Sequence, residues 1–321
     1  MSEQHLWKAL IPYQSSHFTQ SFLCELYSKL GIENAQRKSY QNSNAMSYYL
    51  QHGQNYLKNA DHSSIEIRPV LLFYGLVQLI KGLLLTVDPD YPSHTDVLAH
   101  GVTTRKRKKA NYDFLDDTVK IQTKGLYTHG MSQLFHLNAV PAEKWSMSML
   151  LRSIPDIQEL FLRINRQKPL IRVHIKGQTM TVNERILDSL HMTPDRFCNY
   201  LTRQSGVSFQ LENSTIGDLT LVTSNDIMPS LMHYPFFKNM QDEPFLPLHK
   251  DLYHELPEIF IHYLTLYNLS MICRYETEWW YDLHSQSASN DKPFILQFLD
   301  ISSQKIPKLV GEYLFRCESM I

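Results

Sequence analysis

The sequence predicts a mainly α protein (α+β), with helical N- and C-terminal parts and a small antiparallel β insertion. Two helical stretches support this class. RPVLLFYGLVQLIKGLLL at 68–85 is apolar around nearly its whole circumference, and PEIFIHYLTLYNLSMICRYETEWWYDL begins a long helical pattern at Pro257. Between them, residues 169–225 alternate apolar and polar positions with Gly and Asn punctuation, which is typical of short strands.

The composition is that of a globular chain with a substantial core. It has 321 residues, of which 43% are hydrophobic and 12% aromatic, and a net charge of −1. Such a charge gives no global attraction to nucleic acid or anionic membranes, so any such affinity requires a local patch. Cys24, Cys198, Cys273 and Cys317 are far apart and form no CxxC motif, which favours reduced cysteines in a cytoplasmic protein. MSEQHLWKAL lacks the pattern of a signal peptide.

The N-terminal part is predicted to contain two helices before the central segment. Apolar residues recur every four positions from Phe18 to Leu30, and Gly31 ends that helix. The polar residues 33–45 are expected to begin as a loop, and a second helix is predicted over 45–60.

The central segment is interpreted as a core helix and not as a membrane span. Pro69 suits a first helical position, and Gln78 and Lys81 interrupt the apolar run. Gly75 and Gly82 are seven apart and therefore lie on about the same face. They either let another helix approach closely or are incidental small residues of the core.

The remaining patterns define the domain organisation. They predict, in order, a strand at 119–122, one or two helices over 145–164 broken near Pro155, a short helix over 183–201, an ordered loop at 226–250 and a final helix over 293–318. We therefore divide the chain into a helical region 1–165 with a basic loop at 103–109, a β-containing insertion 166–230, and a C-terminal helical region 231–321 that packs on the first.

The strongest charge cluster is a run of five cations that follows His100. Its members are Arg105, Lys106, Arg107, Lys108 and Lys109. Such a run can neutralise several phosphates of RNA, DNA or a nucleotide, and His100 adds a titratable group. The alternative is a solvated loop whose charges partly neutralise the three aspartates that follow. Aromatic residues for base stacking are sparse in this segment, which favours the alternative.

A second constellation lies near the end of the long C-terminal helical pattern. Arg274 and Glu278 are four apart and would pair on one face of a continuous helix. Trp279 and Trp280 are adjacent and could anchor a protein interface. The alternative is that one of the tryptophans covers the core where the helix ends.

The sequence predicts neither a metal site nor a catalytic residue. His254, Glu258 and His262 follow helical spacing, but Pro257 interrupts that register and HExxH is absent. No GxGxxG, GxxxxGK[ST] or GxSxG motif is present, so no cofactor is predicted.

Three blocks together resemble the YaaC-like bacterial family: RPVLLFYGLVQLIKGLLL, HGVTTRKRKK with KIQTKGLY, and LTLYNLSMICRYETEWW with DKPFILQFLD. The resemblance covers nearly the whole chain. It implies no catalytic motif and therefore no active site. Genes of this family tend to lie beside the gene for IMP dehydrogenase, which motivates the hypothesis of a regulator of guanine-nucleotide synthesis.

Three functions remain open from the sequence. The first is a non-enzymatic regulatory protein that binds a protein partner, with IMP dehydrogenase as the specific candidate. The second is an RNA or nucleotide binder, or a nuclease, that uses His100 and the basic run at 105–109. The third is an enzyme whose site has no familiar motif.

Overall fold

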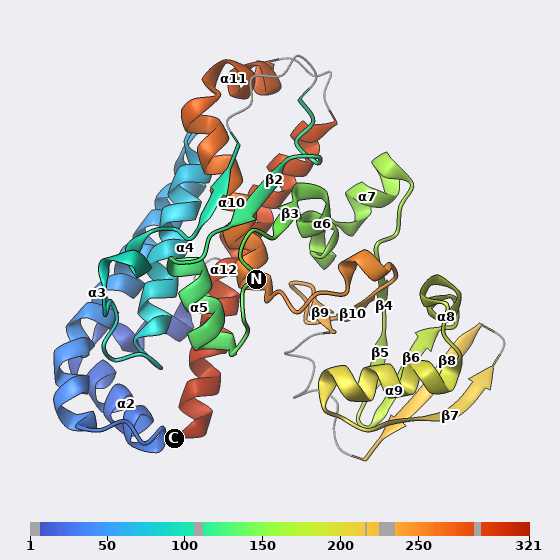
Figure 1. Cartoon of the computed structure of the whole chain (residues 1–321), viewed down its shortest axis with the longest axis horizontal. Helices are drawn as coiled ribbons and strands as arrows, with labels where there is room; N and C mark the ends of the chain where they lie inside the picture. The colour runs from blue at the N-terminus through green and yellow to red at the C-terminus, as the bar shows by residue number, and fades with distance from the viewer. Residues whose placement is uncertain (1–6, 106–111, 216, 225–234, 286–289) are drawn as a thin grey trace. The chain divides into compact units, whose positions relative to one another are not determined.

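The computed structural model describes residues 7–105, 112–215, 217–224, 235–285 and 290–321. It is mainly helical with small antiparallel sheets, as predicted (Figure 1). The chain divides into two compact units, one formed by Met1–Ser146 with His262–Ile321 and the other by Met147–Ile261. The predicted boundaries after residues 165 and 230 both fall inside the second unit.

The first unit is built on long helices. Their bounds are α2 Ser16–Lys29, α3 Ala35–His62, α4 Arg68–Leu84, α5 Leu126–Phe135, α10 Glu258–Tyr275, α11 Thr277–Ser285 and α12 Asp291–Met320. The first turn of α10 belongs to the second unit. The apolar central segment is α4, and Leu72, Phe73 and Leu76 are among its fully buried residues. Among the described residues, no helix is long and apolar enough to cross a membrane.

The expected loop at 33–45 is wrong, because α3 already begins at Ala35. The polar residues there include small serines that face inward, and Ser39 and Ser43 are buried. Small side chains let α3 pack closely on α2, and the Thr19 and Ser47 hydroxyls hydrogen-bond at 3.2 Å between the two helices. Tertiary packing therefore stabilises a helix whose hydropathy resembles that of a loop.

Glycines bring α3 and α4 into close contact along their length (Figure 1). A Cβ atom on Gly75 would lie 2.1 Å from Leu57 Cδ1, and one on Gly82 would lie 2.9 Å from Leu50 Cδ2. Gly53 of α3 lies at the same contact, since a Cβ there would lie 2.6 Å from a carbon of Leu79. The helix-approach interpretation of the central glycines is confirmed.

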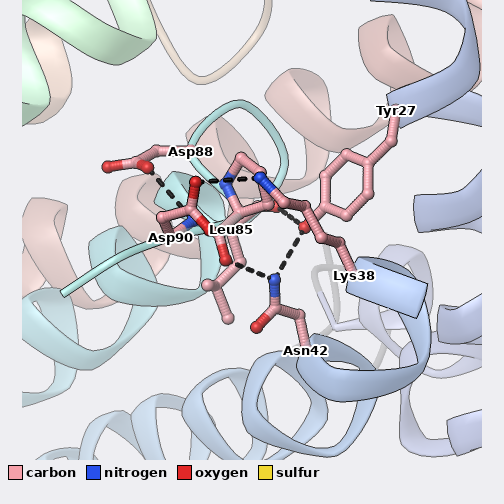
Figure 2. Close-up of polar contacts among 7 residues, drawn as sticks. Tyr27, Lys38, Asn42, Leu85, Asp88 and Asp90 are labelled. Carbon is pink, nitrogen blue, oxygen red and sulfur yellow. Dashed lines mark hydrogen bonds and ion pairs between the residues drawn. The ribbon is translucent and has the colours of Figure 1, made fainter. Parts of the chain in front are cut away.

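Side-chain hydrogen bonds hold the chain where it leaves α4 (Figure 2). The Tyr27 hydroxyl donates to the carbonyl of Leu85. The Asn42 side-chain amide donates to Tyr27 Oη at 3.2 Å and to the Pro89 carbonyl at 2.7 Å. Two earlier helices thus satisfy the polar backbone of the segment that follows α4.

A three-stranded antiparallel sheet completes the first unit, in the order β1-β2-β3. Its strands are β1 Val102–Thr104, β2 Thr118–Ile121 and β3 Lys144–Ser146. The strand predicted at 119–122 is β2, which pairs with β1 through Thr104 and Val119.

The second unit has its own hydrophobic core around two further sheets, β4-β10-β9 and β5-β6-β8-β7. Its elements are α6 Met147–Arg152, α7 Gln158–Asn165, β4 Leu170–Arg172, β5 His174–Lys176, β6 Thr179–Asn183, α8 Arg185–Leu190, α9 Pro194–Ser205, β7 Phe209–Thr215, β8 Asp218–Thr223, β9 Phe237–Lys238 and β10 Pro244–Pro247. The single helix predicted over 183–201 is two helices. The region expected to be a loop after residue 226 includes β10, which returns to pair with β4.

Candidate functional site

The loop that carries His100 is held by a close crossing of two backbone segments. Gly101 and Gly125 have φ angles of +78° and +136°. A Cβ on Gly125 would lie 2.2 Å from the Gly101 Cα atom, so only glycine fits there. The Leu126 N–H donates to the Ala99 carbonyl at 2.7 Å and closes the crossing. The glycines that follow His100 and Lys124 are therefore both explained by this one backbone crossing.

The crossing places the His100 imidazole among aromatic rings from α4 and α10. Its ring centroid lies 4.9 Å from that of Phe73, 6.1 Å from that of Tyr74 and 5.8 Å from that of Tyr267. The Tyr263 hydroxyl donates to the His100 carbonyl at 2.8 Å. His100 Nδ1 is buried and has no hydrogen-bond partner within the described part of the chain.

Two cations act on this imidazole. Burial lowers the pKa of His100 below its ordinary value, and the charges of Arg274 and Lys81 lower that pKa further. The imidazole is therefore neutral at neutral pH, with one nitrogen available as donor or acceptor. The charge of Arg274 therefore acts on His100, although the sequence analysis placed the two residues in separate constellations.

Arg274 is positioned by its own helix. Its Nε donates to the Ser270 carbonyl at 2.8 Å, and its guanidinium carbon lies 5.2 Å from the centroid of the Tyr275 ring. The predicted helical pairing with Glu278 is wrong, because α10 ends at Tyr275 and α11 begins at Thr277. These main-chain and ring contacts of α10 hold the Arg274 side chain in place.

Both ends of the basic run are tied to α10 and α11. Arg105 is exposed directly after β1, and Lys106, Arg107, Lys108 and Lys109 lie outside the described residues. Before the run, Thr104 Oγ1 accepts a hydrogen bond at 3.2 Å from the Asn268 amide of α10. After it, the ring of Tyr112 meets that of Trp279 edge to face at 4.6 Å between centroids.

The buried carboxylate of Asp117 joins these anchors. It accepts hydrogen bonds from the Tyr112 hydroxyl at 2.6 Å, the Asn268 amide at 2.9 Å and the Thr118 N–H at 2.7 Å. A carboxylate in such a network holds its neighbours in place. Asp117 therefore positions the segments on either side of the basic run.

The two adjacent tryptophans have different surroundings. Trp280 is 0% exposed, and its Nε1 donates to the Glu66 carbonyl at 3.2 Å. Trp279 is half-buried against Tyr112, and Glu278 is exposed. The interpretation that one tryptophan covers the core is confirmed for Trp280.

Comparison with family models gives a match over nearly the whole chain. The model described as YaaC-like Protein matches residues 11–314. The chain belongs to the YaaC-like family. The resemblance of the three sequence blocks is thereby confirmed. No curated protein and no solved structure matches this member of the YaaC-like family.

Sequence reasoning missed several side chains of the site in this YaaC-like chain. Tyr74, Lys81, Tyr267 and Asn268 come from helices that were assigned to the core. One signal was available: Tyr74, Gln78 and Lys81 have the spacing i, i+4, i+7 and share one face of α4. All three are partly exposed, whereas most of α4 is buried.

The histidines considered as metal ligands have other contacts. His254 Nε2 and the Ser153 hydroxyl lie 3.0 Å apart, and His262 Nδ1 lies 2.9 Å from the Ser302 hydroxyl. Among the residues that the structure describes, no group of three or more His, Cys, Asp or Glu side chains could hold a metal ion.

Proposed function

We propose that this protein binds a phosphate-bearing nucleobase ligand, RNA or a free nucleotide, at the His100 site and the adjoining basic run. The observation that carries the proposal is the His100 imidazole, whose buried Nδ1 has no hydrogen-bond partner among the described residues and which lies among the rings of Phe73 and Tyr267. Burial and the charges of Arg274 and Lys81 lower the pKa of this histidine. Such a site favours an anion from outside the chain.

The remaining features of the site fit the same ligand. Arginine presents a planar guanidinium that matches phosphate oxygens. His100 Nδ1, which has no hydrogen-bond partner among the described residues, can donate a hydrogen bond to the ligand or accept one from it. Arg105 is exposed and begins the run that would extend the electrostatic surface. Binding is the activity that we propose.

The test is fluorescence anisotropy with labelled single-stranded RNA, competed with free nucleotides. Arg274→Gln and Lys81→Gln should each weaken binding about 10-fold, since each removes a charge-assisted hydrogen bond. Replacing the five cations at 105–109 by Gln should flatten the dependence of affinity on salt. Lys176→Gln, at an exposed lysine of β5, is the matched control.

Two outcomes would contradict the proposal: affinity that is independent of salt, or equal affinity in all of these variants. Competition by mononucleotide alone would identify a nucleotide as the ligand, and its failure would identify RNA. The length of the RNA recovered after incubation separates binding from cleavage.

A second candidate function is regulation through a protein partner, with IMP dehydrogenase as the specific candidate. The observation that favours it is the junction of α10 and α11, where Tyr275 and Tyr281 are 50% and 52% exposed. Tyrosines are frequent hot spots of protein interfaces. Affinity purification with and without nuclease tests it, together with the activity and assembly state of IMP dehydrogenase. An enzyme unchanged in both properties would eliminate that partner.

A further inference from the structure

A shallow groove is lined by side chains of α3 and α4. It has a volume of about 430 Å³ and is lined by Tyr48, Tyr49, Gln51, His52, Asn55 and Gln78. Its size falls within the roughly 300–1,000 Å³ of pockets that hold small ligands. The lining consists of aromatic rings and side-chain amides instead of aliphatic groups, which distinguishes it from an ordinary hydrophobic depression.

A series of rings connects the groove to His100. The His52 and Tyr56 centroids are 4.7 Å apart, and the Tyr56 and Tyr74 rings stack at 6.3 Å with 30° between their planes. Tyr74 in turn lies 6.1 Å from His100. Helix α3 thus presents aromatic faces that continue those around the proposed phosphate-binding imidazole.

The charge of Lys81 acts both on an aromatic ring of the groove and on His100. Its ammonium nitrogen lies 5.8 Å from the centroid of the Tyr49 ring in the groove, and its charge also acts on His100. Burial lowers the pKa of Lys81. A half-buried cation beside an aromatic ring of the groove is suited to an incoming phosphate.

We propose that this groove stacks the bases of a single-stranded nucleic acid or free nucleotide whose phosphate reaches Lys81 and His100. Tyr48 and Tyr49 supply the stacking faces, and the amides of Gln51, Asn55 and Gln78 supply donors and acceptors for base edges. A base inside a duplex has no free face, so the occupant is unpaired. The inference rests on the proposed function and assigns its base-reading surface.

The experiment compares labelled single-stranded RNA with an abasic oligonucleotide of the same length, which carries the phosphates without the bases. The double variant Tyr48→Ala/Tyr49→Ala should bind the base-containing strand about 10-fold more weakly, because stacking is lost. Its affinity for the abasic strand should fall much less, because the Lys81 ammonium that binds phosphate is retained. Tyr40→Ala is the matched control, since Tyr40 is a 71% exposed tyrosine of α3 outside the groove.

Crosslinking of RNA that contains 4-thiouridine to the unmodified protein tests the inference without any substitution. Crosslinked peptides should map to Ala35–His62, which is α3. Crosslinks confined to other segments, or equal losses for both strands in the double variant, would overturn the groove assignment and leave the proposed function standing. If the unmodified protein binds neither strand and no nucleotide, both are overturned.

Discussion

Single residues determine how the chain responds to pH. His254 is mostly buried, and burial lowers its pKa from 6.5 to about 4. The pKa of His100 is lowered as well. A histidine whose pKa is depressed in the folded state stabilises the fold fully above its unfolded pKa. That contribution is lost as the pH falls toward the folded pKa, because the unfolded state takes up protons first.

We therefore expect the free energy of unfolding to fall between pH 6.5 and pH 4. Each pKa unit corresponds to about 1.4 kcal/mol, so His254 alone accounts for about 3 kcal/mol. His254→Asn should make the profile flatter in urea titrations at several pH values. His174→Asn, at an exposed histidine of β5, should leave the profile unchanged. Parallel profiles for the two variants would contradict this assignment.

Gly125 is the residue on which the geometry of the His100 loop depends most. Gly125→Ala should destabilise the protein by about 3 kcal/mol or more, because it adds overpacking to an unfavourable φ of +136°. Gly177→Ala is the matched control: its φ is +59°, but no atom lies within 4 Å of the added Cβ. It should cost only about 1 kcal/mol by thermal or urea unfolding. Equal costs at the two positions would contradict the proposed crossing.

At the scale of elements, the packing of α3 on α4 controls the face that carries the groove. Both helices carry glycines at the contact, so the flanking side chains Tyr49 and Lys81 come close to one another. Glycine normally weakens a helix by about 1 kcal/mol relative to alanine. That cost is offset here by close interhelical packing.

Gly75→Ala should therefore destabilise the protein despite its better helix propensity. A Cβ would lie 2.1 Å from Leu57 Cδ1, and overpacking costs about 1–3 kcal/mol. Gly311→Ala in α12 meets only the Ala9 Cβ at 3.1 Å and should be close to neutral. Urea unfolding of both variants measures the difference. A Gly75→Ala protein more stable than the unmodified one would show that the helices are not in close contact.

At the scale of the whole molecule, the chain has two compact units with separate cores. The core of Met147–Ile261 includes Phe197, which is 0% exposed. In the other unit, Phe298 of α12 is also 0% exposed. Each unit therefore has a large buried ring whose loss should be felt first by its own neighbours.

Phe197→Ala should reduce amide hydrogen-exchange protection in α9 and β8 while α2, α3 and α4 keep theirs. The expected loss is about 3–5 kcal/mol, which is typical of removing a buried phenyl ring. Phe298→Ala is the mirror-image control and should reduce protection in α3, α4 and α12. Uniform loss across the chain in either variant would show that the units unfold as one.

Local patterns in the sequence were sufficient for the class of fold and for many elements. Apolar periodicity predicted α2, α4, α10 and α12, and alternation predicted β2, because each signal depends on neighbours in the chain. The polar start of α3 could not be predicted, since its stability comes from packing on α2. The sequence also determined the family and the unusual cluster of five cations.

The candidate site was decided by tertiary structure. His100 and Arg274 are 174 positions apart, and the sequence analysis recognised them separately. Only the packing of α10 on α4 lets the charge of Arg274 act on the His100 imidazole. Lys81 and Tyr74 belong to a helix that the sequence analysis assigned to the core. Only the packing of the neighbouring elements on α4 determines that the face with these two residues stays partly exposed. The apolar periodicity of a helix can be read from its own sequence. Which distant charges come close to one another depends on which helix faces the packed core leaves exposed.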